Sequence, residues 1–271
     1  MVSTCASKAS LFQLVEHCLF EIEEVQAKCD YSQWIEAEWK ANQLTTTPLF
    51  HELKFDPCLP KNLQLVHPFQ VPKRGLGSIE GRVAFIHAVA HIEYMAIHLA
   101  WDAVYRFPHM PDEYYADWMN VANEEVYHFS LLQTRLQELG FNYGDFVAHD
   151  GLWYIAMETS GDLLARMALV PRGSEARGLD VTPGMIHRLE EVGDQETADL
   201  LKIIYRDEIG HVAKGSKWFR YLCDQQGLDS EQTFQRYFQQ YAPGKMGGKL
   251  DHDGRKKAGF SAVEISFLEK G

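Results

Sequence analysis

Two Glu-x-x-His motifs, each on a stretch with helical apolar periodicity, constrain this chain more than any other feature. Glu125 with His128 forms the first motif, and Glu208 with His211 forms the second. Residues three apart share one face of a helix, and the neighbouring turns of both faces carry apolar side chains such as Phe129. Both glutamates are therefore predicted to be buried. Because an unpaired buried carboxylate costs several kcal/mol, the fold must supply a partner that neutralises each one.

A further glutamate precedes each motif at nearly the same interval. Glu93 lies 32 residues before Glu125, and Glu175 lies 33 residues before Glu208. A single Glu-x-x-His match means little, because a chain of this composition contains about one by chance. The repeated order, a glutamate followed by Glu-x-x-His, instead predicts two helix hairpins that face each other. Four helices would then bring four carboxylates and two imidazoles to one site in the core.

Helical periodicity extends over most of the sequence, and no convincing set of strands is present. Ser78, Asp112 and Asp194 are placed to cap three long helices. Pro171 interrupts the third core helix, which would resume through "SEARGL" until "DVTPGM" ends it. We expect helices over residues 8–41 (as one or two), 78–105, 112–138, 151–170, 184–192, 194–226 and 230–241.

The predicted class is therefore all-α, with a four-helix core and additional helices at both ends. We expect N-terminal helices and an irregular wrapping segment over residues 1–77, and the four-helix core over residues 78–227. Residues 228–271 are expected to form a C-terminal helix and a flexible Gly- and Lys-rich tail.

The composition excludes several classes of protein. A net charge of −12 argues against broad binding to nucleic acid, which uses basic surfaces. The five cysteines are scattered, without a CxxC pair, which favours a reducing cytoplasm over a disulfide framework. No apolar run reaches the ~20 residues that span a bilayer, and the N-terminus lacks a signal peptide pattern. The sequence leaves open whether the chain forms a homodimer.

The predicted cluster of acids and histidines has the chemistry of a metal site. Four carboxylates carry a charge that two divalent cations would balance. Hard oxygen donors with two imidazoles suit iron or manganese, whereas a single zinc ion needs only three or four of these groups. Glu124 and Asp207 directly precede the motif glutamates and are placed to reach the second nitrogen of a ligating histidine. Either could equally be a solvated helix charge.

Other polar side chains near the motifs have two open interpretations. His91 would either bond to other polar groups or support Glu93 on the same helix. Arg177 would pair with a neighbouring acid or bind an anion. Tyr127 and Tyr205 are expected to pack in the core, with a redox or proton-donating role as the alternative.

The full pattern resembles the ferritin-like superfamily of di-iron carboxylate helical bundles. The string "DEIGH" is similar to the fourth-helix motif of several members. The string "LVPRGSEARGLDVTP" resembles the bacterial domain of unknown function family 455, itself distantly similar to di-iron tRNA hydroxylases. The likeness covers about residues 55–241. It implies that the metal ligands are Glu93, Glu125, His128, Glu175, Glu208 and His211.

The resemblance also implies an activity. We expect an oxidoreductase that uses two metal ions, iron foremost and manganese as the alternative, with O₂ or peroxide as oxidant. Its substrate would be a small molecule or a modified nucleotide. A ferroxidase or other metal-handling protein, and a helical scaffold that a metal stabilises, are the alternatives. One position departs from the pattern: Pro171 lies four residues before Glu175 and would kink an α-helix, which leaves Glu158 as the alternative third-helix ligand.

Overall fold

The computed structural model describes residues 8–48, 52–72, 75–241 and 248–270, and it confirms the predicted all-α class. The only strands in these residues are β1 (Ala9–Ser10) and β2 (Leu44–Thr45), which pair in parallel. The helices are α1 (Leu11–Phe20), α2 (Val25–Lys40), the 3₁₀ helix η1 (Pro68–Gln70), α3 (Ile79–Arg106), α4 (Asp112–Glu138), α5 (Gly151–Glu158), α6 (Leu163–Leu169), the π-helix η2 (Val170–Glu175), α7 (Ala176–Glu191), α8 (Gln195–Gln225), α9 (Ser230–Tyr241), α10 (His252–Lys257) and α11 (Ala262–Lys270).

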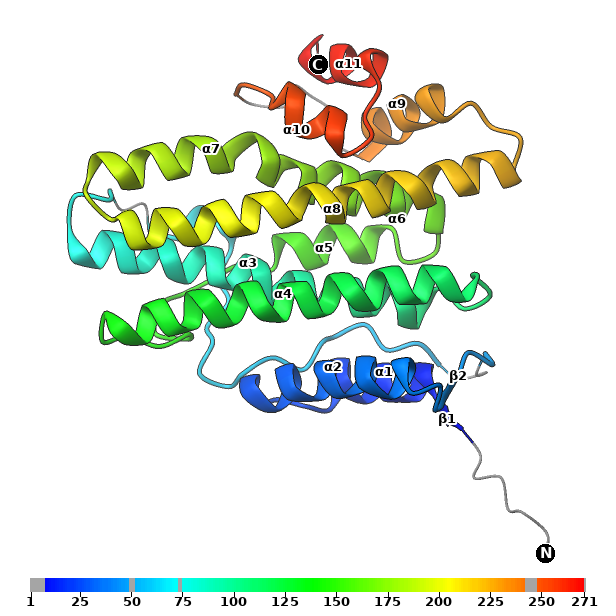
Figure 1. Ribbon diagram of the computed structural model, residues 1–271, viewed down its shortest axis with the longest axis horizontal. Helices are drawn as coiled ribbons and strands as arrows, with labels where there is room; N and C mark the ends of the chain where they lie inside the picture. The colour runs from blue at the N-terminus through cyan, green and yellow to red at the C-terminus, as the bar shows by residue number, and fades with distance from the viewer. Residues whose placement is uncertain (1–7, 49–51, 73–74, 242–247, 271) are drawn as a thin grey trace, which may run out of the picture.

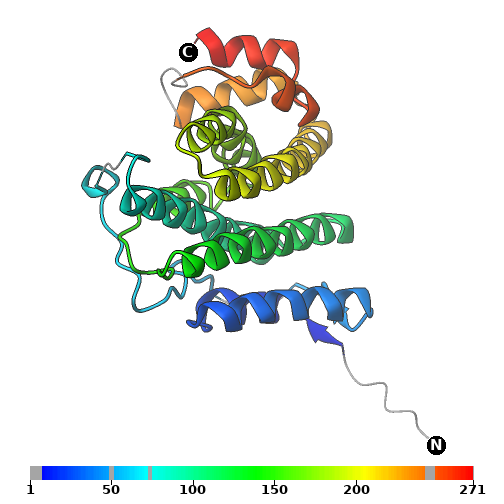
Figure 2. The same ribbon diagram turned by 60° about the vertical axis from the view of Figure 1, so that its left-hand side comes forward.

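The helices stack in layers, which Figures 1 and 2 show from two directions. α1 and α2 form an outer layer that packs on the hairpin of α3 and α4. α7 and α8 form the second hairpin, and the two hairpins meet where α4 packs against α8. α9, α10 and α11 cover the far side of the second hairpin (Figure 1). The space between the hairpins is where the motif residues converge.

The core helices begin close to the predicted cap residues. Ser78 Oγ accepts a hydrogen bond from the backbone N–H of Gly81 at 3.1 Å, and Asp194 Oδ1 accepts one from Thr197 at 3.2 Å. Each bond satisfies an amide that the first turn of a helix leaves without a partner. Asp112 is the first helical residue of α4 rather than its cap, and its carboxylate lies at the positive end of the helix dipole.

Contrary to the expectation that no apolar stretch is long enough to span a bilayer, α3 is apolar over a sufficient length, and it is the one helix of the described residues with that property. It is nevertheless a core helix, because 78% of its most apolar window is buried inside the protein. It packs against α1, α4 and α5. A helix covered on so many sides is expected to be apolar around most of its circumference.

The helix predicted over residues 151–170 is broken in two, so that part of the prediction was wrong. α5 ends at Glu158, and the chain turns through Gly161 before α6 begins. Asp162 Oδ1 accepts a hydrogen bond from the backbone N–H of Ala165 at 3.0 Å. An aspartate that caps a new helix competes with continuation of the old one.

The chain stays helical through Pro171, but as a π-helix. η2 follows α6 directly and leads into α7. A π-helical turn accommodates an additional residue within a helix, which rotates every following side chain by about 100° relative to an uninterrupted α-helix. Gly215 on α8 makes room for this segment, because a β-carbon at Gly215 would lie 2.4 Å from Cβ of Pro171.

The sequence "DVTPGM" also failed to end a helix as predicted, because α7 continues through Pro183 to Glu191. Pro183 removes one backbone hydrogen bond from the helix. Its side chain is exposed, as is the neighbouring Gly184. Water can therefore satisfy the carbonyl that loses its partner, and the helix is retained.

The C-terminal tail, predicted to be flexible, contains two packed helices in its described part. Arg255 on α10 is buried and donates hydrogen bonds to both carboxylate oxygens of Asp180 on α7, at 2.9 and 2.8 Å. Glu264 at the start of α11 is also buried and pairs with Arg172 in η2 at 2.8 Å. These partners lie about 75 to 90 residues upstream, so the composition of the tail alone did not indicate them.

Candidate metal centre

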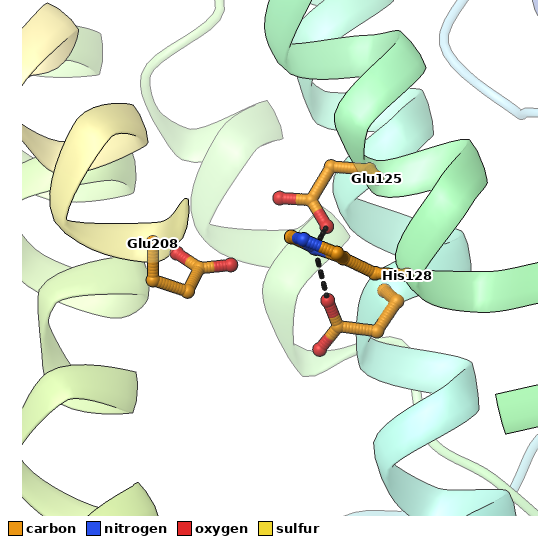
Figure 3. Close-up of side chains that lie close together, drawn as sticks. Glu125, His128 and Glu208 are labelled. Atoms are coloured by element: carbon orange, nitrogen blue, oxygen red, sulfur yellow. Dashed lines mark hydrogen bonds and ion pairs between the residues drawn. The ribbon is translucent and has the colours of Figure 1, made fainter. Parts of the chain in front are cut away.

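Three core helices point acids and a histidine at one position inside the protein. Glu93 on α3, Glu125 and His128 on α4, and Glu208 on α8 each offer a ligand atom, and these atoms all lie within 4.8 Å of one another. Figure 3 shows Glu125, His128 and Glu208 turned toward a common centre. The group could hold a metal ion, since carboxylate oxygens and imidazole nitrogens are common ligands of divalent metals.

Glu125 occupies the middle of this group and uses its two oxygens in different directions. Oε2 lies 3.3 Å from Nδ1 of His128, and Oε1 lies 2.9 Å from Nδ1 of His211. His128 Nδ1 also lies 3.3 Å from Glu93 Oε2, and His211 Nδ1 lies 3.5 Å from Glu208 Oε1. The carboxylate of Glu125 thus lies between two half-sites, each of which contains one imidazole and one further glutamate.

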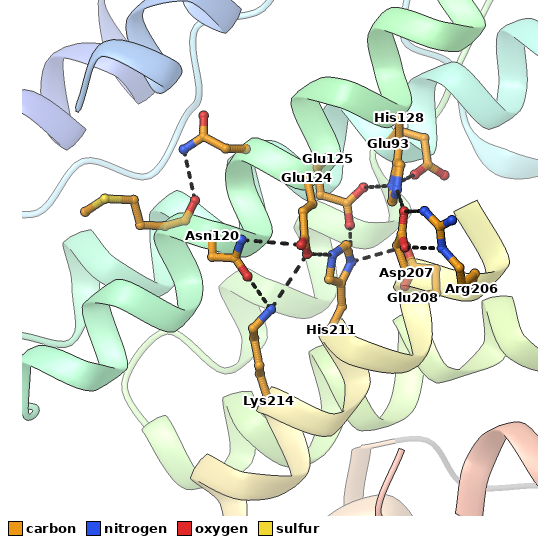
Figure 4. Close-up of polar contacts among 12 residues, drawn as sticks. Glu93, Asn120, Glu124, Glu125, His128, Arg206, Asp207, Glu208, His211 and Lys214 are labelled. Carbon is orange, nitrogen blue, oxygen red and sulfur yellow. Dashed lines mark hydrogen bonds and ion pairs between the residues drawn. The ribbon is translucent and has the colours of Figure 1, made fainter. Parts of the chain in front are cut away.

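The second nitrogen of each imidazole bonds to an acid on the opposite helix (Figure 4). His128 on α4 has Nε2 3.3 Å from Oδ2 of Asp207 on α8. His211 on α8 has Nε2 2.8 Å from Oε2 of Glu124 on α4. A hydrogen bond at Nε2 fixes the ring orientation and directs Nδ1, as a potential ligand atom, toward the centre.

Two cations behind these acids were not predicted from the sequence. Arg206 Nε donates to Asp207 Oδ1 at 2.8 Å. Lys214 Nζ lies 3.7 Å from Glu124 Oε2 and donates to Asn120 Oδ1 at 2.6 Å. A signal was available for Lys214, which lies three residues after His211 and therefore on the same helix face. The spacing gives no indication that Lys214 contacts Asn120 and Glu124 on α4.

Glu175 reaches the same region from the end of η2. It lines the same partly open cavity as Glu93 and Glu208. Burial, with the neighbouring Glu208 and Glu125, raises the pKa of Glu175 to about 8. Glu175 is not part of the tight group of four ligand atoms, but the π-helical register turns it toward that group.

Burial and mutual repulsion shift the proton affinities of the other acids. Burial, together with Glu125, raises the pKa of Glu93 well above its usual value, and burial with Glu125 also raises that of Glu208. Burial would likewise raise the pKa of Glu125, but the two imidazoles outweigh it and hold this pKa far below its ordinary range. Glu125 is therefore the carboxylate that stays ionised most readily.

The imidazoles are shifted in the opposite direction. Burial alone would lower the pKa of His128, but Glu125 and Glu93 outweigh it and raise that pKa to about 11. The pKa of His211 is likewise raised well above its usual value, because Glu125 and Glu208 outweigh the effect of burial. In the absence of another cation, protonated imidazoles balance the central carboxylate.

Two ligand atoms, Glu175 Oε2 and Glu208 Oε2, are buried without a hydrogen-bond partner among the described residues. Glu93 Oε2, Glu125 Oε1 and His211 Nδ1 are buried as well and make only the ion-pair contacts given above, without a well-aligned hydrogen bond. Buried polar atoms in native proteins are nearly always satisfied, so a cluster of orphaned ones requires an explanation such as a bound ion. The donor set fits a metal ion, because these oxygens and nitrogens come from opposite sides of one centre.

The remaining predicted site residues lie apart from this centre. His91 is held by Tyr143 Oη at 2.8 Å and by the carbonyl of His149 at 3.0 Å, so both of its ring nitrogens have other partners than Glu93. Arg177 pairs with Asp180 at 3.3 Å.

The two tyrosines and the alternative ligand also lie elsewhere. Tyr127 is 49% exposed, contrary to the expected core packing. Tyr205 donates a hydrogen bond from its hydroxyl to Asp251 in the C-terminal segment. Glu158 is exposed and lies on α5, separated from η2 by the turn at Gly161, so it does not share a helix with Glu175 as the alternative assignment required.

The fold and the site together define an all-α protein with glutamates and histidines gathered in its core. The chain belongs to the family described as "Protein of unknown function (DUF455)", which matches residues 21–266 and confirms the family resemblance found in the sequence.

A relative in Haemophilus influenzae, described as an uncharacterized protein, is 42% identical over 218 residues. The alignment covers 78% of this chain and 76% of the relative. No solved structure matches the chain significantly.

Proposed function

We propose that this protein is a metal-dependent oxidoreductase whose centre holds two metal ions. The observation that carries the proposal is the position of Glu125, whose two oxygens face the Nδ1 atoms of His128 and His211 at 3.3 and 2.9 Å. Glu125 would contribute ligand atoms to both half-sites. Glu93 and His128 would complete one half-site, and Glu175, Glu208 and His211 the other.

Iron is the metal that this donor set suits best, with manganese as the alternative. Hard carboxylate oxygens combined with imidazole favour these metals, and two divalent ions would balance four carboxylates. When bound, two iron ions would supply one-electron and O₂ chemistry to an organic substrate. The same arrangement of acids and histidines is known from ferritin-like di-iron bundles, which the sequence resembles.

The residues of the chain would prepare this centre in three ways. Glu175 Oε2 and Glu208 Oε2, which have no hydrogen-bond partner among the described residues, provide ligand atoms that no protein group occupies. Glu124 and Asp207 hold the imidazole rings through Nε2 and leave Nδ1 directed inward. Glu125 and His128 are both fully inaccessible to solvent, and such burial strengthens the electrostatic interactions that they make.

A reducing compartment such as the cytoplasm agrees with the free thiols of the described chain. Cys18, Cys29, Cys58 and Cys223 form no disulfide, whereas disulfides are common in proteins of oxidising compartments. We infer a small molecule as the substrate rather than a nucleic acid, since the net charge of −12 disfavours broad electrostatic contact with phosphates.

Elemental analysis is the direct test of the metal centre. Full-length protein from cells supplied with both iron and manganese is expected to contain about two metal ions per chain. Glu125→Gln should lose most of this metal, because both half-sites lose a charged oxygen. Glu113→Gln is the matched control: it changes an exposed acid of the same helix that pairs with Lys217. A metal-free wild type, or unchanged metal content in Glu125→Gln, would contradict the proposal.

O₂ uptake then separates the functional alternatives. An oxidoreductase of this kind should consume O₂ beyond the amount needed to oxidise its own Fe²⁺ when a reductant and substrate are supplied. Uptake limited to Fe²⁺ oxidation would indicate metal handling instead. Metal binding that raises the melting temperature without any redox activity would indicate a scaffold. A ligand at about 100 times its Kd stabilises a protein by roughly 2.7 kcal/mol, so the thermal shift is measurable in each case.

A further inference from the structure

A partly open cavity of about 230 Å³ lies beside the proposed metal ligands, between α3 and α7. Its walls are largely apolar: Val89, Ile92 and Ala96 come from α3, and Val181 and Met185 come from α7. Leu201 and Ile204 of α8 contribute further apolar surface. The cavity is smaller than the roughly 300–1,000 Å³ of pockets that hold drug-sized ligands, so its volume fits a compact molecule.

Three of the proposed metal ligands form the acidic part of this cavity. Glu93, Glu175 and Glu208 all line it. On α3, Glu93 lies between Val89 and Ala96, so apolar side chains flank the acids along the helix. A ligand in the cavity would therefore lie directly against the proposed centre, with its apolar portion enclosed.

Arg177 is the one Lys or Arg side chain among the lining residues, and it lies at the rim. Its side chain is 35% exposed, and together with Ser174 it also lines a neighbouring hollow of about 380 Å³. A positive charge placed at the edge of an apolar cavity is suited to bind one anionic group.

The acid that pairs with Arg177 already has a stronger partner. Asp180 accepts hydrogen bonds from Arg255 at 2.9 and 2.8 Å and from the backbone N–H of Asp251 at 2.9 Å. Its contact with Arg177 is longer, at 3.3 Å. Because Arg255 is fully buried and neutralises Asp180, the guanidinium of Arg177 keeps most of its capacity to bind an anion.

We propose that the cavity binds a compact apolar acid, with its carboxylate at Arg177 and its apolar body between α3 and α7. Arg177 is the one cationic side chain of the lining and the rest of the wall is largely apolar, so the carboxylate lies at the rim and the apolar part points toward the centre. The proposal rests on the proposed function, for which it names the substrate class, but the binding step itself needs no redox activity.

Calorimetric titration with octanoate and octanol tests the proposal, since the two probes share a chain and differ in charge. Wild-type full-length protein should bind octanoate about ten-fold more tightly than octanol, as expected for a charge-assisted contact. Arg177→Gln should remove this preference without weakening the binding of octanol. Arg188→Gln, which changes an exposed arginine of the same helix, is the matched control and should retain the preference.

Val181→Phe is expected to fill the cavity and abolish binding of both probes while leaving the melting temperature and metal content close to wild type. Equal affinity for the two probes, no binding of either, or a preference that survives Arg177→Gln would overturn the proposal. Metal analysis of the same samples separates the two ideas. Metal-loaded protein that fails to bind octanoate refutes the substrate class alone, whereas octanoate binding by protein that takes up no metal refutes the proposed function alone.

Discussion

Gly215 on α8 lies directly against the ring of Pro171 in η2, where a β-carbon at Gly215 would be 2.4 Å from Cβ and 2.5 Å from Cγ of the proline. Gly215→Ala should therefore push η2 away from α8 and displace Glu175. We expect a loss of about 1–3 kcal/mol in the free energy of unfolding, the usual cost of overpacking, together with reduced metal content. Urea denaturation and elemental analysis measure the two effects.

Gly210→Ala on the same helix is the control for that substitution. No atom lies within 4 Å of the position that its β-carbon would take. Replacing this helical glycine should stabilise the protein by roughly 0.5–1 kcal/mol and leave metal content unchanged. If both alanine variants behave alike, contact between Gly215 and Pro171 does not hold η2 in place.

Glu264 connects the C-terminal segment to the same π-helix through its buried ion pair with Arg172 at 2.8 Å. The guanidinium also lies over the rings of Phe219, Phe234 and Phe260 at 4.8, 4.5 and 4.5 Å. Glu264→Ala leaves that charge buried without its acid and should cost about 3–5 kcal/mol, measured by urea denaturation. The double variant Arg172→Met with Glu264→Leu should recover most of this loss, because apolar groups can replace a buried pair. A double variant as unstable as Glu264→Ala would contradict this account.

Glu124 is predicted to raise metal affinity without touching the metal. Its carboxylate accepts a hydrogen bond from His211 Nε2 at 2.8 Å. Glu124→Ala would free the ring to rotate, and the loss of such a supporting contact typically lowers metal affinity about 10–100-fold. Competition with a chromogenic chelator gives the affinity. Glu124→Gln keeps an acceptor oxygen, so its metal affinity should lie between those of the wild type and Glu124→Ala. A wild-type affinity in Glu124→Ala would argue against a supporting role of Glu124.

His87 should make the stability of the protein depend on pH in the mildly acidic range. Burial, assisted by His91, lowers the pKa of His87 to about 4, and its Nε2 accepts a hydrogen bond from the backbone N–H of Gly144 at 2.9 Å. The folded protein thus keeps this imidazole neutral, while the unfolded chain takes up a proton near pH 6.5. The stabilisation is complete above about pH 6.5 and is lost as the pH falls toward 4.

Urea denaturation of wild type and His87→Gln across this range measures the effect. The glutamine can still accept from Gly144 but does not titrate. Its stability should fall less steeply with decreasing pH, by up to about 1.4 kcal/mol per pH unit, which corresponds to one proton. Parallel curves for the two proteins would show that His87 is not the group responsible.

The parts of this molecule that depend on local rules were predictable from the sequence. Ser78 and Asp194 cap helices because a serine or aspartate side chain bonds to amides three residues ahead. The spacing of Glu125 and His128 places both on one face of α4, and the apolar neighbours of that face indicate burial. The all-α class follows from many such local preferences acting together.

The parts that depend on distant packing were not predictable. Pro171 reads as a helix breaker, but the space left by Gly215 lets the chain continue as a π-helix. The composition of the C-terminal tail predicts a flexible segment, but Arg255 in this tail binds Asp180, which lies 75 residues earlier, and this contact orders the tail. Tyr127 reads as a core residue from its position near the motif, yet it lies on the outer face of α4. For Pro171 and Arg255 the deciding partner belongs to another element.

The contacts between α4 and α8 cross, so the orientation of each imidazole depends on an acid of the opposite helix. Glu124 supports a ring on α8, and Asp207 supports a ring on α4. Separation of these two helices would remove both supports at once, whichever histidine is considered. If the centre holds metal as proposed, loss of the ion should then accompany separation of the two hairpins, and the residence time of the metal would report how often they separate.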